Sequence, residues 1–212
     1  MRRRAALGAL GGLGALAAPG GAVVLLGACA SLPPPPPLPP ERSHSGRFAI
    51  TATLDGRSDS QSGRFVLQTR GAELTLDLAT PLGTTLARLQ DGPEGARLRA
   101  PAPDGRMQEV QGASAEALAL QLLGWPLPLA GIPFWIEGRP MPGAAVQLRG
   151  ADGAVLLQQD GWTIAVQERF ADGLPRRLQI TRPALAGTAP DQPPQPALNL
   201  RLVLDEPGGA AQ

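Results

Sequence analysis

An alternation of apolar and polar residues with a period of two is the feature that most constrains the fold of this chain. It runs through the segments 48–54, 74–78 and 198–204, in which every second side chain is apolar. A period of two places successive side chains on opposite faces of a β-strand and allows one face to be buried. Each segment is therefore predicted to be a half-buried strand.

Further short strands follow the same pattern, and turn signals separate many of them. These strands are predicted at 63–68, 84–90, 96–100, 106–111, 145–149, 154–159, 162–169 and 176–181. The turn signals are Asp55-Gly56, Asp91-Gly92, Asp104-Gly105, Asp152-Gly153, Asp160-Gly161 and Asp172-Gly173. Short strands joined by such turns favour an antiparallel meander, either a sandwich or a curved barrel. Nothing in the pattern supports parallel β-α-β units.

One segment in the middle of the chain has a helical pattern instead. Ser114 is suited to cap a helix, Gly124 is suited to end it, and Leu118 and Leu122 lie one turn apart. A second short helix is predicted at about 130–136, after a Pro-rich interruption. We expect this apolar helical insert to cover one open end or one face of the sheet.

The N-terminus has the layout of a secretory signal. Three arginines at 2–4 precede an uncharged stretch at 5–28, which ends in small residues. Leu26-Gly27-Ala28-Cys29 resembles the lipobox of bacterial lipoproteins, in which the signal is removed and the new N-terminal Cys carries a diacylglycerol and a palmitoyl group. The alternatives are an uncleaved membrane anchor and a plain signal peptide with an incidental Cys. Seven glycines and a proline in the stretch weigh against a membrane-spanning helix.

These features divide the chain into four parts. Residues 1–28 are the predicted signal peptide, 29–41 an acylated Cys with a Pro-rich linker, 42–206 a single domain, and 207–212 a flexible tail. The LPPPPPLPP run favours extended polyproline II and forms a spacer of roughly 25–30 Å. A proline-binding module as its partner is the less favoured alternative.

Composition and motifs exclude several functions. Removing residues 1–28 removes three of the 19 basic residues and none of the 18 acidic ones, which leaves a net charge of −2. Nucleic acid is therefore not an expected partner. No metal-ligand spacing, phosphate loop or G-x-S-x-G motif is found, so we expect no cofactor, no metal and no enzyme activity. The single histidine, His44, is expected to be solvent-exposed, and the acidic residues are expected mostly in turns.

The order of short motifs along the chain resembles the LolB family of outer-membrane lipoproteins. These motifs are Gly46-Arg47-Phe48, Gly63-Arg64-Phe65, Pro81-Leu82-Gly83, Leu123-Gly124-Trp125 with Pro128, Trp135-Ile136-Glu137-Gly138 with Pro140, and Gly161-Trp162-Thr163-Ile164 followed by Leu174-Pro175. The resemblance implies a mainly β fold, an incomplete antiparallel β-barrel whose curved sheet encloses an apolar cavity covered by a short helical insert. This chain departs from the family in having no Tyr and no Trp near its C-terminus.

The resemblance also implies a function and partners. A member of the family accepts acylated lipoprotein cargo from the periplasmic carrier LolA and inserts it into the inner leaflet of the outer membrane, without enzymatic chemistry. The chain is then expected to be anchored in the outer membrane by Cys29, facing the periplasm, as a monomer. The alternatives are a lipid-anchored structural or assembly lipoprotein with a packed core, and a soluble carrier like LolA. The lipobox argues against the carrier.

Two sets of site residues follow from the resemblance. Pro81, Leu82 and Gly83 form the predicted membrane-insertion loop, because proline at the second turn position and glycine at the fourth place Leu82 at the tip. The alternative is that Leu82 packs under the sheet. The candidate acyl-binding cavity or lid residues are Phe48, Ile50, Phe65, Leu74, Leu76, Leu118, Leu122, Trp125 and Trp135. The two tryptophans either gate the cavity or pack the insert onto the sheet.

Overall fold

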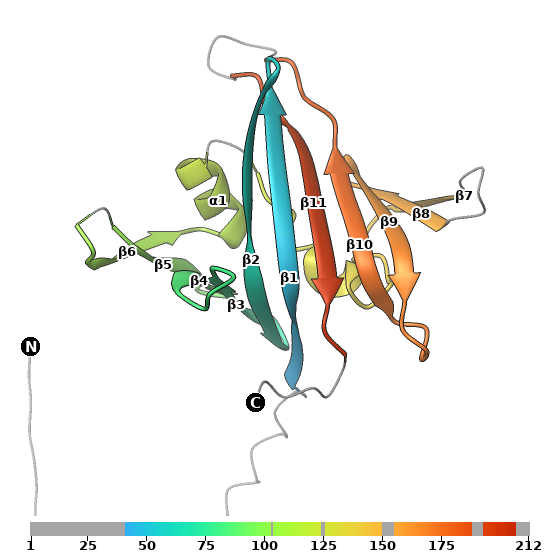
Figure 1. The fold of residues 1–212 in the computed structure, drawn as a ribbon, viewed down its shortest axis with the longest axis horizontal. Helices are drawn as coiled ribbons and strands as arrows, with labels where there is room; N and C mark the ends of the chain where they lie inside the picture. The colour runs from blue at the N-terminus through green and yellow to red at the C-terminus, as the bar shows by residue number, and fades with distance from the viewer. Residues whose placement is uncertain (1–40, 103, 124–125, 150–154, 188–192, 207–212) are drawn as a thin grey trace, which may run out of the picture. The chain divides into compact units, whose positions relative to one another are not determined.

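The computed structural model describes residues 41–206 except 103, 124–125, 150–154 and 188–192. The predicted signal peptide, Cys29, the Pro-rich run and the tail 207–212 lie outside the described residues. Within them the elements are β1 (Glu41–Leu54), β2 (Arg57–Arg70), β3 (Glu73–Ala79), β4 (Thr85–Gly92), β5 (Gly95–Pro101), β6 (Met107–Gly112), α1 (Ala115–Leu123), α2 (Ile132–Trp135), β7 (Val146–Arg149), β8 (Val155–Gln159), β9 (Trp162–Arg169), β10 (Pro175–Arg182) and β11 (Ala197–Leu204) (Figure 1).

The described strands form one antiparallel sheet that does not close. Their order is β6-β5-β4-β3-β2-β1-β11-β10-β9-β8-β7, so consecutive strands pair with each other except β6 and β7, and the first and last strands, β1 and β11, pair in the middle of the sheet. The predicted meander is confirmed, and of its two versions the curved, incomplete barrel is the correct one. β6 pairs only with β5 and β7 only with β8, so these two strands are the edges of the sheet.

Turn chemistry explains most of the strand boundaries. At Asp55-Gly56 and Asp160-Gly161 both residues have positive φ, which is the conformation of a tight hairpin turn whose twist matches its strands. The prediction of a turn at Asp91-Gly92 is wrong. β4 continues through Gly92, which pairs with Gly95. The fixed φ of Pro93 and the positive φ of Gly95 place the turn two residues later.

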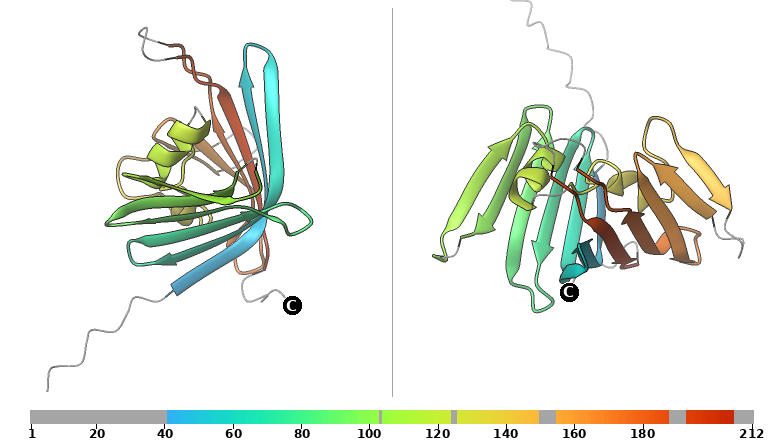
Figure 2. Two further views of the ribbon diagram at one scale, coloured as in Figure 1. Left: turned by 90° about the vertical axis from the view of Figure 1, so that its left-hand side faces the viewer. Right: turned by 90° about the horizontal axis from the view of Figure 1, so that it is seen from above.

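The two helices lie on the concave side of the curved sheet, between its two arms (Figure 2). Ser114 caps α1 as predicted, since its hydroxyl accepts a hydrogen bond from the Ala117 amide at 3.2 Å. Leu118 packs so closely on β6 that a Cβ atom on Gly112 would lie 2.8 Å from it. Glu116 accepts a hydrogen bond from the Ala130 amide at 2.5 Å, which connects α1 to the segment before α2. The insert therefore covers one face of the sheet rather than an open end.

Candidate functional site

The concave face of the sheet is apolar across most of its width. A single cluster of buried and half-buried apolar side chains extends from β6 to β8, and both helices contribute to it. Seven of the nine candidate cavity residues belong to this cluster: Phe48, Ile50, Phe65, Leu74, Leu76, Leu118 and Trp135. Leu122 lies in α1, but its side chain is outside the described part of the chain, as is all of Trp125.

The candidates differ in burial. Phe65, Leu76, Leu118 and Trp135 are buried, whereas Phe48, Ile50 and Leu74 are half-buried. Other half-buried members of the cluster come from both arms of the sheet and from the insert: Ala52, Leu78, Leu98, Val110, Leu127, Ile132, Phe134, Met141, Leu157, Val166 and Phe170. These half-buried side chains are the part of the apolar cluster that is in contact with solvent.

The candidate residues predicted from the sequence include none from β8 to β11, which form the second arm of the sheet. Leu178 and Ile180 on β10 are fully buried, and Leu198, Leu200 and Leu202 on β11 belong to the same cluster. The period-two signal that predicts the β11 strand could have identified these residues, because it marks their shared apolar face.

Trp135 is packed into the core and hydrogen-bonded. It is 1% exposed, and its indole nitrogen donates to Gln159 Oε1 at 3.3 Å. Gln159, on β8, also accepts from the Met141 amide at 3.0 Å and donates to the Met141 carbonyl at 2.8 Å. One buried glutamine therefore connects α2 and the chain after it to the second arm of the sheet. This environment favours the packing interpretation of Trp135 in the conformation described.

Leu82 lies at the tip of the loop between β3 and β4. It is 96% exposed, the highest value among the large apolar side chains found exposed in the described residues. The Gly83 amide donates to the Thr80 carbonyl at 2.9 Å, and the Thr84 amide donates to Thr80 Oγ1 at 3.1 Å. Gly83 has a φ of +92°, which glycine adopts without strain. The loop is thus a hydrogen-bonded turn that holds Leu82 in solvent, and the alternative of a leucine packed under the sheet does not hold.

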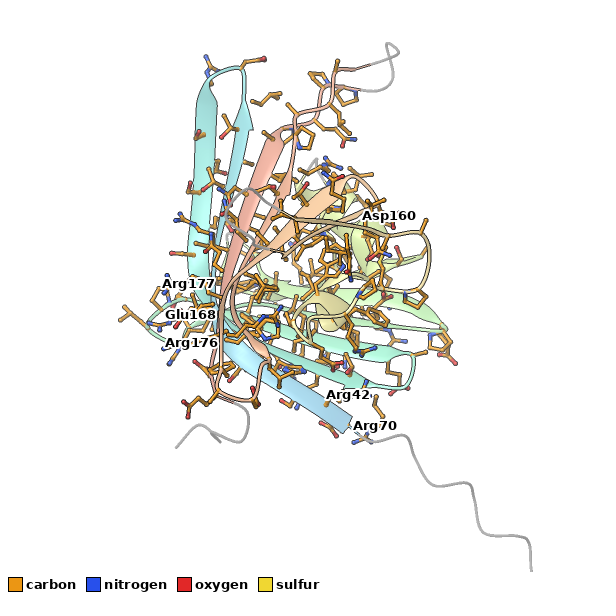
Figure 3. All side chains as sticks on the ribbon, turned by 90° about the vertical axis from the view of Figure 1, so that its right-hand side faces the viewer. Arg42, Arg70, Asp160, Glu168, Arg176 and Arg177 are labelled. Carbon is orange, nitrogen blue, oxygen red and sulfur yellow. The ribbon has the colours of Figure 1, made fainter. Side chains whose placement is uncertain are left out.

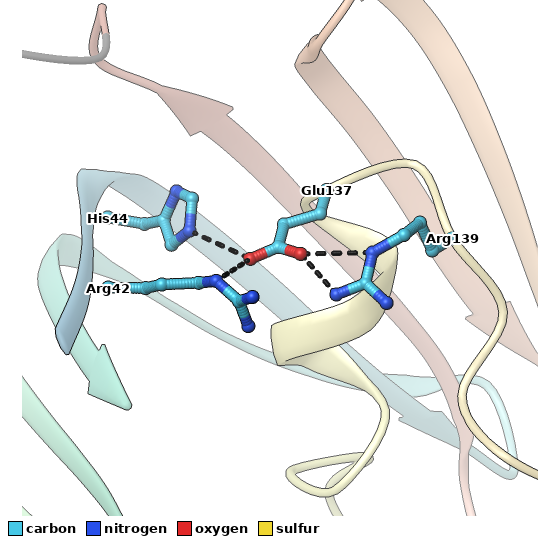
Figure 4. A network of polar contacts seen from close by, with 4 residues as sticks. All are labelled: Arg42, His44, Glu137 and Arg139. Atoms are coloured by element: carbon cyan, nitrogen blue, oxygen red, sulfur yellow. Dashed lines mark hydrogen bonds and ion pairs between the residues drawn. The ribbon is translucent and has the colours of Figure 1, made fainter. Parts of the chain in front are cut away.

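A charged network connects the insert to the start of β1 (Figure 4). Glu137, just after α2, is bound by Arg139 and lies 3.6 Å from both Arg42 Nε and His44 Nε2. Burial alone would raise the pKa of Glu137, but Arg139, Arg42 and His44 together outweigh it and lower the pKa below its ordinary value. The expectation that His44 is solvent-exposed is wrong, because its side chain is half-buried against Glu137. The polar sequence around His44 gives no sign of the insert that packs on it.

One arginine lies inside the apolar region. Arg182, on β10, is 9% exposed, and its guanidinium carbon lies 5.3 Å from the ring centroid of Trp162. It donates to Gln195 Oε1 at 2.6 Å, while its Nε has no hydrogen-bond partner in the described part of the chain. Burial lowers the pKa of this guanidinium from its ordinary value. The stacking on Trp162 and the bond to Gln195 hold its side chain in place.

Several acidic residues lie on strands, contrary to the expectation that they lie mostly in turns. Asp77 binds Arg88 at 2.5 Å, and Glu109 binds Arg99 at 2.6 Å, each across neighbouring strands. Within the described ranges, no group of three or more His, Cys, Asp and Glu side chains is arranged to hold a metal ion. Nor does any helix of the described part have the length and apolar character to cross a membrane.

The comparisons with known proteins agree on one family. Residues 41–206 match the family model described as outer membrane lipoprotein LolB. This chain belongs to the LolB family.

Three relatives, each named outer-membrane lipoprotein LolB, illustrate the similarity. The Ralstonia nicotianae protein is 35% identical over 77% of this chain and 78% of its own length. The Cupriavidus necator protein is 35% identical over 87% and 92%, and the Bordetella pertussis protein 34% identical over 87% and 89%. Membership in the LolB family identifies the chain as an outer-membrane lipoprotein and is consistent with the open sheet with a helical insert.

Proposed function

We propose that this chain is a receptor that accepts acylated lipoproteins from the periplasmic carrier LolA and inserts them into the inner leaflet of the outer membrane. The observation that carries the proposal is the apolar concave face of an open sheet in a member of the LolB family. The task needs no covalent chemistry. It needs a surface that shields acyl chains from water and a way to release them into lipid.

The concave face supplies the shield. Burial of each methylene group of an acyl chain is favourable by about 0.8 kcal/mol, so exposing several chains to water during transfer would be prohibitive. The half-buried side chains Phe48, Ile50 and Leu74, with Phe134 and Ile132 of α2, offer an aliphatic and aromatic surface for these chains. Cargo binding then requires α2 and the segment after it to move away from the sheet, since they cover this face.

Release requires the membrane to be the better solvent for the cargo. The exposed Leu82 is the residue we assign to this step, because a leucine held in water by a hydrogen-bonded turn lowers its free energy when it enters lipid. Acylation of Cys29 would hold the domain at the membrane that receives the cargo. Under this proposal the receptor works as a monomer.

A transfer assay tests the proposal. The mature acylated chain is placed in vesicles and mixed with LolA that carries a labelled lipoprotein, and flotation measures how much cargo becomes membrane-bound. We expect the wild type to remove cargo from LolA and insert it. Leu82→Glu is expected to remove cargo from LolA but to leave it uninserted, as a complex with the receptor.

Met107→Glu is the matched control, because Met107 is also an exposed apolar residue but lies at the start of the edge strand β6. We expect it to insert cargo as the wild type does. Cargo that stays on LolA in the presence of the wild type would contradict the receptor role and favour a structural lipoprotein. Normal insertion by Leu82→Glu would contradict the role of the loop alone.

A further inference from the structure

Two arginines lie directly opposite each other on the convex face of the sheet. Arg47 on β1 pairs in register with Arg64 on β2, and both are exposed. Their neighbours Phe48 and Phe65 belong to the apolar cluster on the concave face, so the arginines project from the other face. Like charges at directly opposite positions of an antiparallel pair are destabilising. The arginine pair therefore does not stabilise the fold.

Several arginines elsewhere on the sheet are paired with carboxylates. Arg88 binds Asp77, Arg99 binds Glu109, and Arg176 binds Glu168, each within 2.6 Å. In contrast, neither Arg47 nor Arg64 has a carboxylate oxygen within 4.0 Å in the part of the chain that the structure describes. Figure 3 shows Arg176, Arg177 and Glu168 on the convex side of the β9–β10 arm, where the opposite charges do meet.

The arginine pair lies at the base of the Leu82 loop. Ala79, the last residue of β3 before the loop, pairs with Arg64, which pairs in turn with Arg47. Because neighbouring strands lie about 4.8 Å apart, Arg47 is roughly 10 Å from the point where the loop begins. The loop projects to the convex side of the sheet, away from the helices (Figure 2). The exposed leucine and the two arginines therefore share one side of the domain.

Arg201 extends the same patch. It lies on β11 opposite Ala49 of β1, which is two residues from Arg47 on the same face, and it is exposed. Arg201 also has no carboxylate oxygen within 4.0 Å in the described residues. We call Arg47, Arg64 and Arg201 the convex arginine patch. It concentrates positive charge on a domain whose mature chain is expected to be net negative.

We infer that the convex arginine patch binds the phosphate groups of anionic phospholipids in the receiving membrane while Leu82 enters the acyl region beside them. This inference rests on the proposed function, which directs Leu82 into lipid. An apolar side chain next to cationic ones is the combination that binds a membrane interface, since the leucine is buried below the headgroups while guanidinium groups stay at their level. Arginine suits this task because its planar donors match two phosphate oxygens at once.

Binding to cargo-free vesicles tests the inference apart from cargo transfer. The mature chain with Cys29→Ala lacks the acyl anchor, so its partition onto vesicles reports the domain's own affinity. Each basic residue near an anionic surface contributes a factor of about five to binding, so Arg47→Gln/Arg64→Gln is expected to bind phosphatidylglycerol-containing vesicles about 25-fold more weakly. Its binding to neutral phosphatidylcholine vesicles is expected to be unchanged, because Leu82 is intact.

Arg57→Gln/Arg97→Gln is the matched control. It removes the same charge from exposed arginines that lie far from the loop, at the distant end of β2 and on β5. We expect it to bind anionic vesicles within about twofold of the starting protein, and thermal unfolding to show that both double variants fold. Equal losses in the two double variants, or none in Arg47→Gln/Arg64→Gln, would overturn the inference.

Two further outcomes separate this inference from the proposed function. If the wild type takes no cargo from LolA but the arginine variant still loses vesicle binding, the proposed function fails and the lipid-binding patch stands. If the arginine variant binds vesicles normally but no longer binds LolA, the patch recognises an acidic protein surface and the lipid assignment is wrong.

Discussion

The ring of Phe48 lies against Gly63 of the neighbouring strand, where a Cβ atom on the glycine would be 3.0 Å from Phe48 Cε1. The same arrangement recurs in reverse two residues along, with Phe65 over Gly46. The two Gly-Arg-Phe motifs are thus a reciprocal pair: each phenylalanine covers the glycine of the other motif on the concave face. The intervening arginines are consequently placed opposite each other on the convex face.

A side chain at Gly63 should destabilise the domain. In Gly63→Ala the new Cβ would lie 2.2 Å from the Ala79 carbonyl oxygen, so β2 must shift against β3, and the Phe48 ring must give way as well. Overpacking of this kind costs about 1–3 kcal/mol. Urea denaturation should show this loss, whereas Ser62→Ala, an exposed neighbour on the same strand, should change the free energy of unfolding by less than about 0.5 kcal/mol. Equal stability of the two variants would show that the close approach is not important.

The buried side chain of Gln159 should be essential for holding the insert. Gln159→Leu leaves the Trp135 indole N–H and the Met141 amide and carbonyl without their partner. Each buried polar group left unpaired costs about 1–3 kcal/mol, so we expect a total loss of roughly 3 kcal/mol or more in the free energy of unfolding. Gln158→Leu, on the exposed face of the same strand, is the control and should have little effect. Trp135 should also become more accessible to a fluorescence quencher in Gln159→Leu.

Helix α1 should behave as a packed element of the core. Leu118 is 1% exposed against β6, so Leu118→Ala should cost about 2–5 kcal/mol in the free energy of unfolding. Leu120→Ala removes the same atoms from a side chain that is 45% exposed and should cost less than about 1 kcal/mol. If both variants lost equally little stability, α1 would be a loosely held lid instead.

The strands could be predicted because burial of one face of a strand produces an alternation of apolar and polar residues in the sequence. For β9 the predicted bounds, 162–169, are those of the structure, and the Leu198–Leu204 alternation corresponds to β11. The exposed position of Leu82 also follows from local turn chemistry. Asp91-Gly92 shows the limit of this reasoning, since a competing proline and glycine nearby determined where the turn formed.

Contacts between distant segments could not be predicted in the same way. Nothing local to Gln159 indicates that it bonds to Trp135, and nothing near His44 indicates that it meets Glu137. These contacts exist because the insert folds back across the concave face, and their partners are fixed only when the sheet has curved. The register that places Arg47 opposite Arg64 is set by the position of the Asp55-Gly56 turn. The turn was predicted from the sequence, but the residue pairs between the two strands were not.

The Glu137 network should make the stability of the insert depend on pH. The folded state lowers the pKa of Glu137, so this carboxylate stabilises the domain above the ordinary glutamate pKa of about 4.3, and the contribution is lost as the pH falls through the lower folded value. The stability difference between wild type and Glu137→Gln should therefore be largest near neutral pH and shrink as the pH falls from about 5 to about 3.

Arg139→Gln should raise the pKa of Glu137, because burial then opposes ionisation with fewer cations to offset it, and the loss should begin at a higher pH. Glu94→Gln, in the exposed turn after β4, is the control and should follow the wild type. Denaturant unfolding at a series of pH values measures all four proteins, and a constant difference between wild type and Glu137→Gln across this range would contradict the role of the network.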